Sequence, residues 1–168
     1  MMPDITVVKR DIAILQVDAI VNAANNSLLG GGGVDSAIHR VAGPELLQAC
    51  RKIGGCITGD VKLTPGYDLP AKWVFHTVGP VWQGGIYGEP ELLASCYQKT
   101  LELALDRGVE SIAFPAIATG AFAYPIQKAA RVAVREIVNF QNSHGGPEQV
   151  ILACFDSETE DIYRNLLS

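Results

Sequence analysis

The sequence predicts an α/β protein with a central, mostly parallel mixed sheet of about six strands and helices on both faces. Strand-like segments alternate with helix-like segments along the chain, which is typical of this architecture. Several strand-like segments are almost continuously apolar, as expected when both faces of a sheet are covered. The 168 residues contain no low-complexity segment, internal repeat or long linker, so we expect one domain over residues 1–168.

The first part of the chain predicts two strands followed by two helices. Residues 5–9 alternate between polar and apolar side chains, and residues 19–22 form a short apolar run followed by turn formers. Both patterns are typical of strands. From Asp35 onward apolar residues recur with helical period until a Gly-Pro pair ends the helix, and a second helix is predicted over 45–53.

The rest of the chain predicts four more strands and three more helices. One apolar segment contains Pro115, which cannot donate to a strand ladder and is expected at a bulge or at the end of its strand. Pro90 can begin a helix because its missing N–H is not needed at the first position. The predicted strands cover 61–64, 73–78, 112–117 and 149–155, and the predicted helices cover 90–108, 125–140 and 157–167.

Composition and charge exclude several classes of protein. No stretch approaches the ~18 apolar residues of a membrane span, and the first residues lack the character of a signal peptide, so we expect a cytoplasmic protein with no membrane partner. A net charge of −5 gives no general attraction to nucleic acid, and RNA binding is not expected. Cys50, Cys56, Cys96 and Cys154 show neither C-x-x-C pairing nor zinc-ligand spacing, which predicts free buried thiols and no metal site.

Four consecutive glycines at 30–33 form the most informative segment. Such a run is unfavourable inside a helix or strand, because each glycine loses much backbone freedom on folding. Glycines with positive φ can turn successive N–H groups toward one point, and this arrangement at a helix N-terminus suits phosphate oxygens. Asp35 follows closely, and its carboxylate either caps the helix or takes part in the chemistry of a site.

A second loop, residues 118–124, is also suited to phosphate. It offers consecutive backbone N–H groups, the hydroxyl of Thr119 and the ring of Phe122 before the next helix begins. Ligands of parallel α/β sheets bind at the carboxyl ends of the strands. This rule predicts that the second loop converges with residues 22–35 and 79–88.

These motifs, in this order, resemble the macrodomain family and, within it, the MacroD-type branch. The resemblance covers residues 7–167 and implies a three-layer α/β/α macrodomain that needs no cofactor. The matching motifs are Asn22-Ala-Ala-Asn25, Gly30-Gly-Gly-Gly-Val-Asp35, Ala37-Ile-His-Arg40, His76-Thr-Val-Gly-Pro80 and Phe114-Pro-Ala-Ile-Ala-Thr-Gly120.

The resemblance implies a hydrolase that binds ADP-ribose and cleaves esters at its distal ribose. The substrate would be O-acetyl-ADP-ribose, a protein that carries mono-ADP-ribose on Asp or Glu, or both, and we expect a monomer. Asp35, together with a substrate phosphate, would orient the attacking water, and Asn25 would hold the ribose hydroxyls. A non-catalytic module that only binds ADP-ribose is the alternative, because it would make the same contacts.

The resemblance also assigns the ligand contacts. Asp11 would accept from the adenine amino group or, alternatively, cap a turn after the first strand. Phe155 either stacks near the adenine or joins the core, and Asn22 ties its loop together through backbone hydrogen bonds. His76 lies within a predicted apolar strand and His39 one turn into a predicted helix, so both are interpreted as structural. No nucleophile–base constellation stands out, and no covalent nucleophile is expected. The predicted catalytic residues are Asp35 and Asn25, and the predicted ligand-binding residues are Asp11, Ile12, Asn22, Gly31, Gly32, Gly33, Val34, Ala118, Thr119, Gly120, Ala121, Phe122, Ala123 and Phe155.

The chain departs from the family pattern at four positions. The family commonly has glycine where this chain has Arg10, Ser36 and Ala123, and serine where it has Ala118. If the backbone at Ala123 requires a positive φ, the Cβ of that alanine costs about 1 kcal/mol or more, or shifts the loop. We expect ligand binding to survive these changes.

Overall fold

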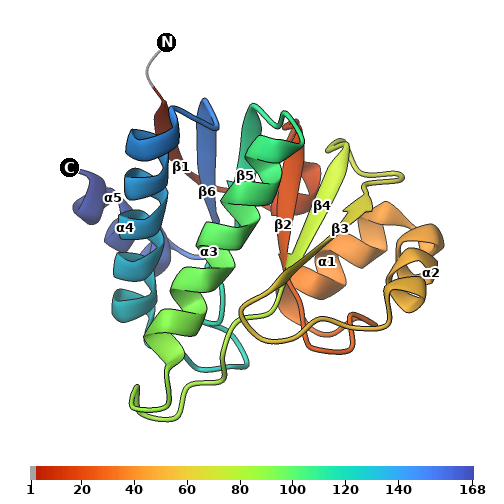
Figure 1. Cartoon of the computed structure of the whole chain (residues 1–168), viewed down its shortest axis with the longest axis horizontal. Coiled ribbons are helices and arrows are strands. Elements are labelled where there is room, and N and C mark those ends of the chain that lie inside the picture. The colour runs from red at the N-terminus through yellow and green to blue at the C-terminus, as the bar shows by residue number, and fades with distance from the viewer. Residues whose placement is uncertain (1–2) are drawn as a thin grey trace.

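The computed structural model describes residues 3–168 and contains a six-stranded mixed sheet between two layers of helices (Figure 1). Only the pair β3–β4 is antiparallel within the described sheet, and its other four pairs are parallel. This confirms the predicted fold class. The strands, in their order across the sheet, are β1 (Asp4–Lys9), β6 (Gln149–Cys154), β5 (Ser111–Phe114), β2 (Ala19–Ala23), β4 (Trp73–Thr77) and β3 (Val61–Pro65).

Helices cover both faces of the sheet, and each layer has its own apolar cluster. One cluster contains residues of α3, α4 and α5, and the other contains residues of the short 3₁₀ helix η1 and of α1 and α2. The helices are η1 (Ile12–Ile14), α1 (Gly33–Ala42), α2 (Pro44–Ile53), α3 (Glu89–Asp106), α4 (Ile126–His144) and α5 (Ser157–Leu167). No helix within residues 3–168 is long and apolar enough to cross a bilayer.

Neighbouring residues of the central strand β2 enter opposite layers. Ala19 and Val21 belong to the cluster under α3 and α4, whereas Ile20 belongs to the cluster under α1 and α2. Side chains alternate between the two faces of a strand, and all three residues are fully buried. A strand covered on both faces therefore has to be apolar at successive positions, which explains the continuous apolar runs in the sequence.

Some predicted boundaries were wrong, and the ends of β5 and α4 have a local cause. The strand predicted over 112–117 ends at Phe114, directly before Pro115, in agreement with the expected position of that proline. The helix predicted over 125–140 continues to His144, where Gly145 adopts the left-handed conformation and donates its N–H to the carbonyl of Gln141. Helix α1 begins at Gly33 rather than near Asp35.

Candidate functional site

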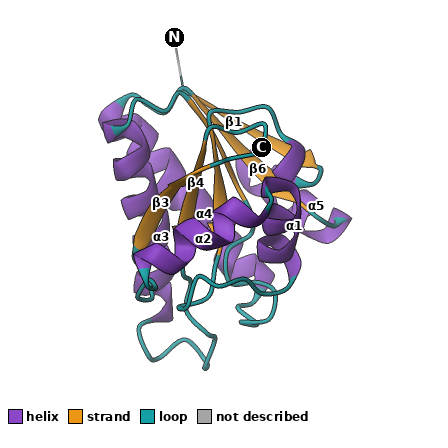
Figure 2. Ribbon diagram, turned by 90° about the vertical axis from the view of Figure 1, so that its right-hand side faces the viewer, coloured by secondary structure: helices purple, strands orange, loops and turns teal. Residues whose placement is uncertain are grey.

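A cavity of about 430 Å³ lies at the carboxyl ends of β2, β5 and β6. Loops gather below the sheet in both views (Figures 1 and 2), and the loop between β4 and α3 extends furthest beyond it in Figure 1. The volume suits a small organic ligand. The predicted residues that line the cavity are Asn25, Gly31, Gly32, Gly33, Val34, Asp35, Ala118, Thr119, Gly120, Ala121, Phe122 and Phe155.

The glycine loop leads into the N-terminus of α1 without a side-chain cap. Gly32 is the N-cap residue and no side-chain hydrogen bond caps the helix. Gly30 and Gly33 have φ of 97° and 59°, a region in which residues with a Cβ are strained. The first N–H groups of a helix have no partner within the helix, so this end of α1 can receive an anion at the cavity.

Asn25 organises the glycine loop through its side-chain amide. Its Nδ2 donates to the carbonyl of Gly30 at 2.8 Å. Its Oδ1 accepts from the hydroxyl of Ser27 at 2.7 Å and from the backbone N–H of Leu28 at 3.1 Å. The side chain therefore closes the loop while it also faces the cavity, a structural role that the sequence analysis had not assigned to it.

Asp35 is only 4% exposed, although it lines the cavity. Its Oδ1 accepts from Asn22 Nδ2 at 2.9 Å and lies 3.2 Å from His39 Nε2, which forms no hydrogen bond. A Cβ on Gly31 would lie 3.3 Å from both Asp35 Oδ2 and Asn25 Nδ2, so this glycine allows close approach. Since Gly32 is the N-cap, the interpretation of Asp35 as a cap is wrong.

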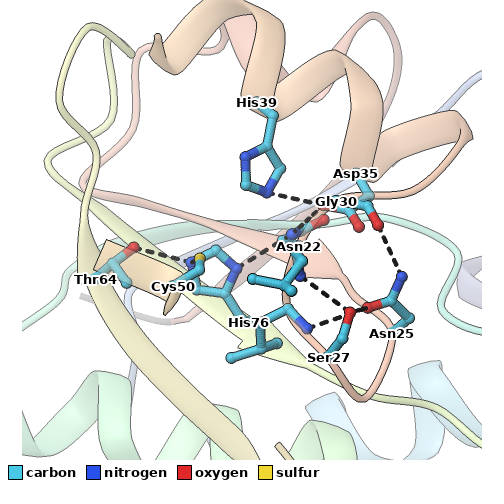
Figure 3. A network of polar contacts seen from close by, with 11 residues as sticks. Asn22, Asn25, Ser27, Gly30, Asp35, His39, Cys50, Thr64 and His76 are labelled. Atoms are coloured by element: carbon cyan, nitrogen blue, oxygen red, sulfur yellow. Dashed lines mark hydrogen bonds and ion pairs between the residues drawn. The ribbon is translucent and has the colours of Figure 1, made fainter. Parts of the chain in front are cut away.

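Asn22 and His76 lie behind Asp35 and are fully buried (Figure 3). Asn22 lies on β2, outside the cavity lining, and its side chain bonds to Asp35 and His76. The prediction that it ties its loop together through the backbone was therefore wrong about its partners. Burial, followed by the neighbouring His39, lowers the pKa of His76 to about 4 against the opposing effect of Asp35, so this imidazole is neutral at physiological pH.

The second loop is held in a compact turn by its own backbone. Ala123 donates its N–H to Gly120, and Tyr124 donates to Ala118, both at 2.9 Å. The Thr119 hydroxyl donates to the carbonyl of Ala116 at 2.8 Å. Ala118 and Ala123 have φ of 69° and 61°. At Ala123, where the family commonly has glycine, the departure from the family pattern therefore places a Cβ in the left-handed region.

Replacement of Ala123 by glycine is expected to raise the free energy of unfolding by up to about 1 kcal/mol, because it removes a Cβ from a left-handed backbone. Ala121 in the same loop does not have a positive φ, and Ala121→Gly is the matched control, expected to be neutral or destabilising. Denaturant melts of both variants measure the difference. Equal losses of stability in the two variants would show that Ala123 is unstrained.

Glu89 anchors the loop between β4 and α3. Its carboxylate accepts from the backbone N–H groups of Gln83, Gly85 and Tyr87 at 2.7–2.9 Å. The same loop reaches the cavity, because the backbone N–H of Trp82 donates to the carbonyl of Phe122, a cavity residue, at 2.8 Å. Sequence reasoning missed Glu89, since nothing in the local pattern shows that a helix-terminal glutamate turns back onto the preceding loop.

Trp82 itself is partly buried. Its ring centroid lies 4.6 Å from that of Tyr124, and the Lys128 ammonium lies 5.4 Å from the Trp82 ring centroid. Trp82 is therefore a packed side chain beside the site, and its fluorescence can report on the loop that Glu89 anchors.

Glu89→Gln is expected to loosen this loop at neutral pH, because an amide NH₂ cannot accept backbone hydrogen bonds. Burial alone would raise the pKa of Glu89, but the donating N–H groups lower it below its ordinary value of 4.5. The stabilisation is thus present above pH 4.5 and is lost as pH falls through the lower folded-state pKa. Acrylamide quenching of Trp82, measured in a Trp73→Phe background, should be high for the variant at pH 7 and for the parent only below pH 4.5.

The opposite end of the cavity is formed by residues that follow β6. Phe155 is 56% exposed and lines the cavity, so its interpretation as a core residue is wrong. Asp156, which sequence reasoning missed, also lines it and caps α5 through the N–H of Thr159. Asp11 Oδ1 accepts from Ala13 N at 2.9 Å and caps η1, as the alternative interpretation stated.

Four predicted binding residues lie outside the cavity lining: Asp11, Ile12, Asn22 and Ala123. The lining residues that the prediction omitted, apart from Asp156, are small or apolar: Ala23, Ala24, Gly79, Pro115, Ala116, Ile126, Ala153 and Thr159. Most of them end or follow a strand, so a strict application of the strand-end rule would have found them.

The cavity is lined by two acidic side chains, Asp35 and Asp156, and by no Lys, Arg or His among residues 3–168. An anionic ligand would therefore have to be bound by backbone N–H groups and the dipole of α1 rather than by cations. In the same part of the chain, no three His, Cys, Asp or Glu side chains are grouped as metal ligands. All four cysteines are free and buried.

Comparison with known sequences identifies relatives over nearly the whole chain. The family model of the Macro domain matches residues 21–133. A macro domain-containing protein of Chlorobaculum tepidum is 55% identical, with 99% of each chain covered. A protein of Citrobacter koseri named O-acetyl-ADP-ribose deacetylase is 53% identical, and the alignment covers 94% of this chain and 92% of that protein.

Solved structures share the fold. A macrodomain of Oceanobacillus iheyensis, determined with ADP, superposes with a TM-score of 0.92 at 42% identity and covers 96% of this chain and 88% of that one. A macrodomain of Trypanosoma brucei in complex with ADP-ribose gives a TM-score of 0.93 at 45% identity, with 98% of this chain and 69% of that one covered.

Proposed function

The chain belongs to the macrodomain family, and we propose from this that it binds ADP-ribose and hydrolyses esters at the distal ribose. Its substrates are O-acetyl-ADP-ribose, proteins that carry mono-ADP-ribose on a carboxylate side chain, or both. One relative is named a deacetylase of the first compound, and one neighbouring structure is a complex with ADP-ribose.

The observation that carries the proposal is the placement of a nearly buried carboxylate beside an uncapped helix N-terminus. Asp35 lies in the first turn of α1, whose N–H groups face the same cavity. The diphosphate is bound by the backbone of the glycine loop and of residues 118–122. The positive end of the helix dipole adds to this attraction, which fits a lining without cations.

In the proposed reaction, a water molecule attacks the carbonyl carbon of the ester. The Asp35 carboxylate orients this water and accepts its proton, a contribution that typically amounts to roughly 10²–10⁴-fold in rate. The bond between the carbonyl carbon and the ribose oxygen then breaks, and the ribose oxygen receives the proton. The products are ADP-ribose and a carboxylic acid, and no covalent intermediate with the protein forms.

Chromatographic detection of ADP-ribose formed from O-acetyl-ADP-ribose at neutral pH tests the activity against the uncatalysed rate. Calorimetric titration with ADP-ribose, run in parallel, tests binding separately. Turnover well above background supports the hydrolase. Binding without turnover on this substrate or on a mono-ADP-ribosylated protein leaves a module that only binds ADP-ribose, and the absence of binding contradicts the proposal as a whole.

A further inference from the structure

A buried network of hydrogen-bonded polar side chains extends from β3 to the cavity (Figure 3). His76 Nε2 lies 2.9 Å from Thr64 Oγ1, and His76 Nδ1 lies 3.1 Å from Asn22 Nδ2. The same Asn22 Nδ2 donates to Asp35 Oδ1 at 2.9 Å. Three members of this network, Thr64, His76 and Asn22, are at most 2% exposed and lie outside the cavity lining. Asp35 is therefore the residue through which the network reaches the ligand site.

The proton positions on Asn22 and His76 follow from the acceptor role of Asp35 Oδ1 toward Asn22 Nδ2. A carboxylate only accepts, so Asn22 must present its NH₂ group to Asp35 rather than its oxygen. The second hydrogen of that NH₂ group points to His76 Nδ1, which must therefore be unprotonated. A neutral imidazole with a free Nδ1 carries its proton on Nε2, where the Thr64 hydroxyl can accept it.

The orientation of Asn22 leaves one polar atom without a partner. Asn22 Oδ1 is buried and forms no hydrogen bond, which is unfavourable for a buried acceptor. Rotation of the amide would not give Oδ1 a donor, because it would turn this oxygen toward Asp35 Oδ1 and His76 Nδ1 in place of the NH₂ group. The observed orientation is therefore imposed by these two acceptors.

We propose that His76 is a positioning residue of the site: its neutral Nε2–H tautomer fixes the Asn22 amide, and the amide holds the Asp35 carboxylate in place for the attacking water. Thr64 acts in the same way through His76, because it accepts the proton that defines the tautomer. The role in hydrolysis rests on the proposed function, whereas the tautomer itself does not.

Burial and the neighbouring His39 favour the neutral form of His76 and outweigh the opposing effect of Asp35. The other neighbours of His76 are Cys50, whose Sγ lies 3.9 Å from Nε2, and His39, beyond Asp35. Burial raises the pKa of the Cys50 thiol to about 11, so this sulfur is protonated at neutral pH. A proton on His76 Nδ1 would face the Asn22 NH₂ group and break its contact.

Nitrogen-15 NMR of the full chain at pH 7 tests the tautomer directly. The expected spectrum shows His76 with an unprotonated Nδ1 and a protonated Nε2. A protonated Nδ1 or a charged ring would overturn the assignment. Because the measurement uses the unmodified protein, it decides the question even if every His76 variant fails to fold.

Steady-state kinetics tests the consequence for hydrolysis. His76→Leu removes the acceptor for Asn22 and Thr64→Val removes the acceptor for His76, and both are expected to lower kcat roughly tenfold or more with little change in ADP-ribose Kd. His76→Asn can return an acceptor oxygen to the position of Nδ1 and is expected to recover most of the turnover. Thr100→Val is the matched control, since Thr100 is a fully buried threonine of α3 whose hydroxyl has no partner.

Folded His76→Leu and Thr64→Val variants with the parental kcat would refute the positioning role. A parent chain without turnover on either substrate would refute the proposed function and, with it, the role in hydrolysis. In that case the NMR measurement still tests the tautomer of His76 by itself. A failure of the proposed function can thus be distinguished from a failure of the tautomer assignment.

Discussion

Replacement of Asp35 by asparagine is expected to lower turnover of O-acetyl-ADP-ribose roughly 10²–10⁴-fold, the usual contribution of a general base, with ADP-ribose affinity changed far less. Asn is nearly isosteric with Asp but cannot take a proton from water. The amide oxygen of the new asparagine can still accept the hydrogen bond that Asn22 donates to Asp35 Oδ1 in the parent. The glycine loop should therefore remain in place. An effect on kcat with a nearly constant Kd identifies a group that acts mainly in the transition state.

The comparison requires both rate and affinity. Single-turnover hydrolysis gives the rate of the chemical step, and calorimetry gives the Kd of ADP-ribose for the parent and the variant. Asp106→Asn at the exposed end of α3 is the matched control. Equal single-turnover rates for Asp35→Asn and the parent would remove Asp35 from the mechanism, whereas an equal fall in rate and affinity would make it a binding residue.

Replacement of Asn25 by alanine is expected to weaken ADP-ribose binding roughly 10–100-fold, because three hydrogen bonds worth about 1 kcal/mol each are lost. These bonds join the side chain to Gly30, Ser27 and Leu28. Without them, the backbone of the glycine loop is less restricted, and its N–H groups must be ordered when the ligand binds. The cost of this ordering appears directly in the binding free energy.

Ser27→Ala provides the graded control for this prediction. It removes the hydroxyl that donates to Asn25 and accepts from the backbone of Leu29, but it leaves the bond from Asn25 to Gly30 intact. Titration calorimetry should therefore place its affinity between those of the parent and Asn25→Ala. Parental affinity in Asn25→Ala would contradict the view that this side chain preorganises the loop.

Much of the site could be predicted because its ligand-facing groups come from short segments. The glycine loop and residues 118–122 line the cavity as expected, since parallel strands bring their carboxyl ends to one edge of the sheet. A loop needs only glycine residues or a turn to present its backbone N–H groups to a ligand. Both features can be recognised in the local sequence. Phe155 follows β6 directly, and its position at the cavity was one of two alternatives for the same reason.

The role of Asp35 could not be decided from its neighbours in the sequence. A carboxylate in the first turn of a helix is a common cap, and local sequence offers no reason to reject this. The structure rejects it because Gly32 is the N-cap and because Asn22, from a strand 13 residues earlier, supplies a hydrogen-bond donor. The positive φ of Ala123 was likewise only a condition in the sequence analysis, and the turn from Gly120 to Tyr124 is what imposes it.

By itself, the sequence determined the order of strands and helices, the layered α/β architecture and the two loops that meet at the cavity. These features depend on periodicity, turn residues and chain direction, all of which are local. Only the tertiary structure decided that Thr64, His76 and Asn22 stand behind Asp35. Such hydrogen bonds depend on which side chains meet after the sheet is assembled, and their partners can be more than 50 residues apart, as Asn22 and His76 are.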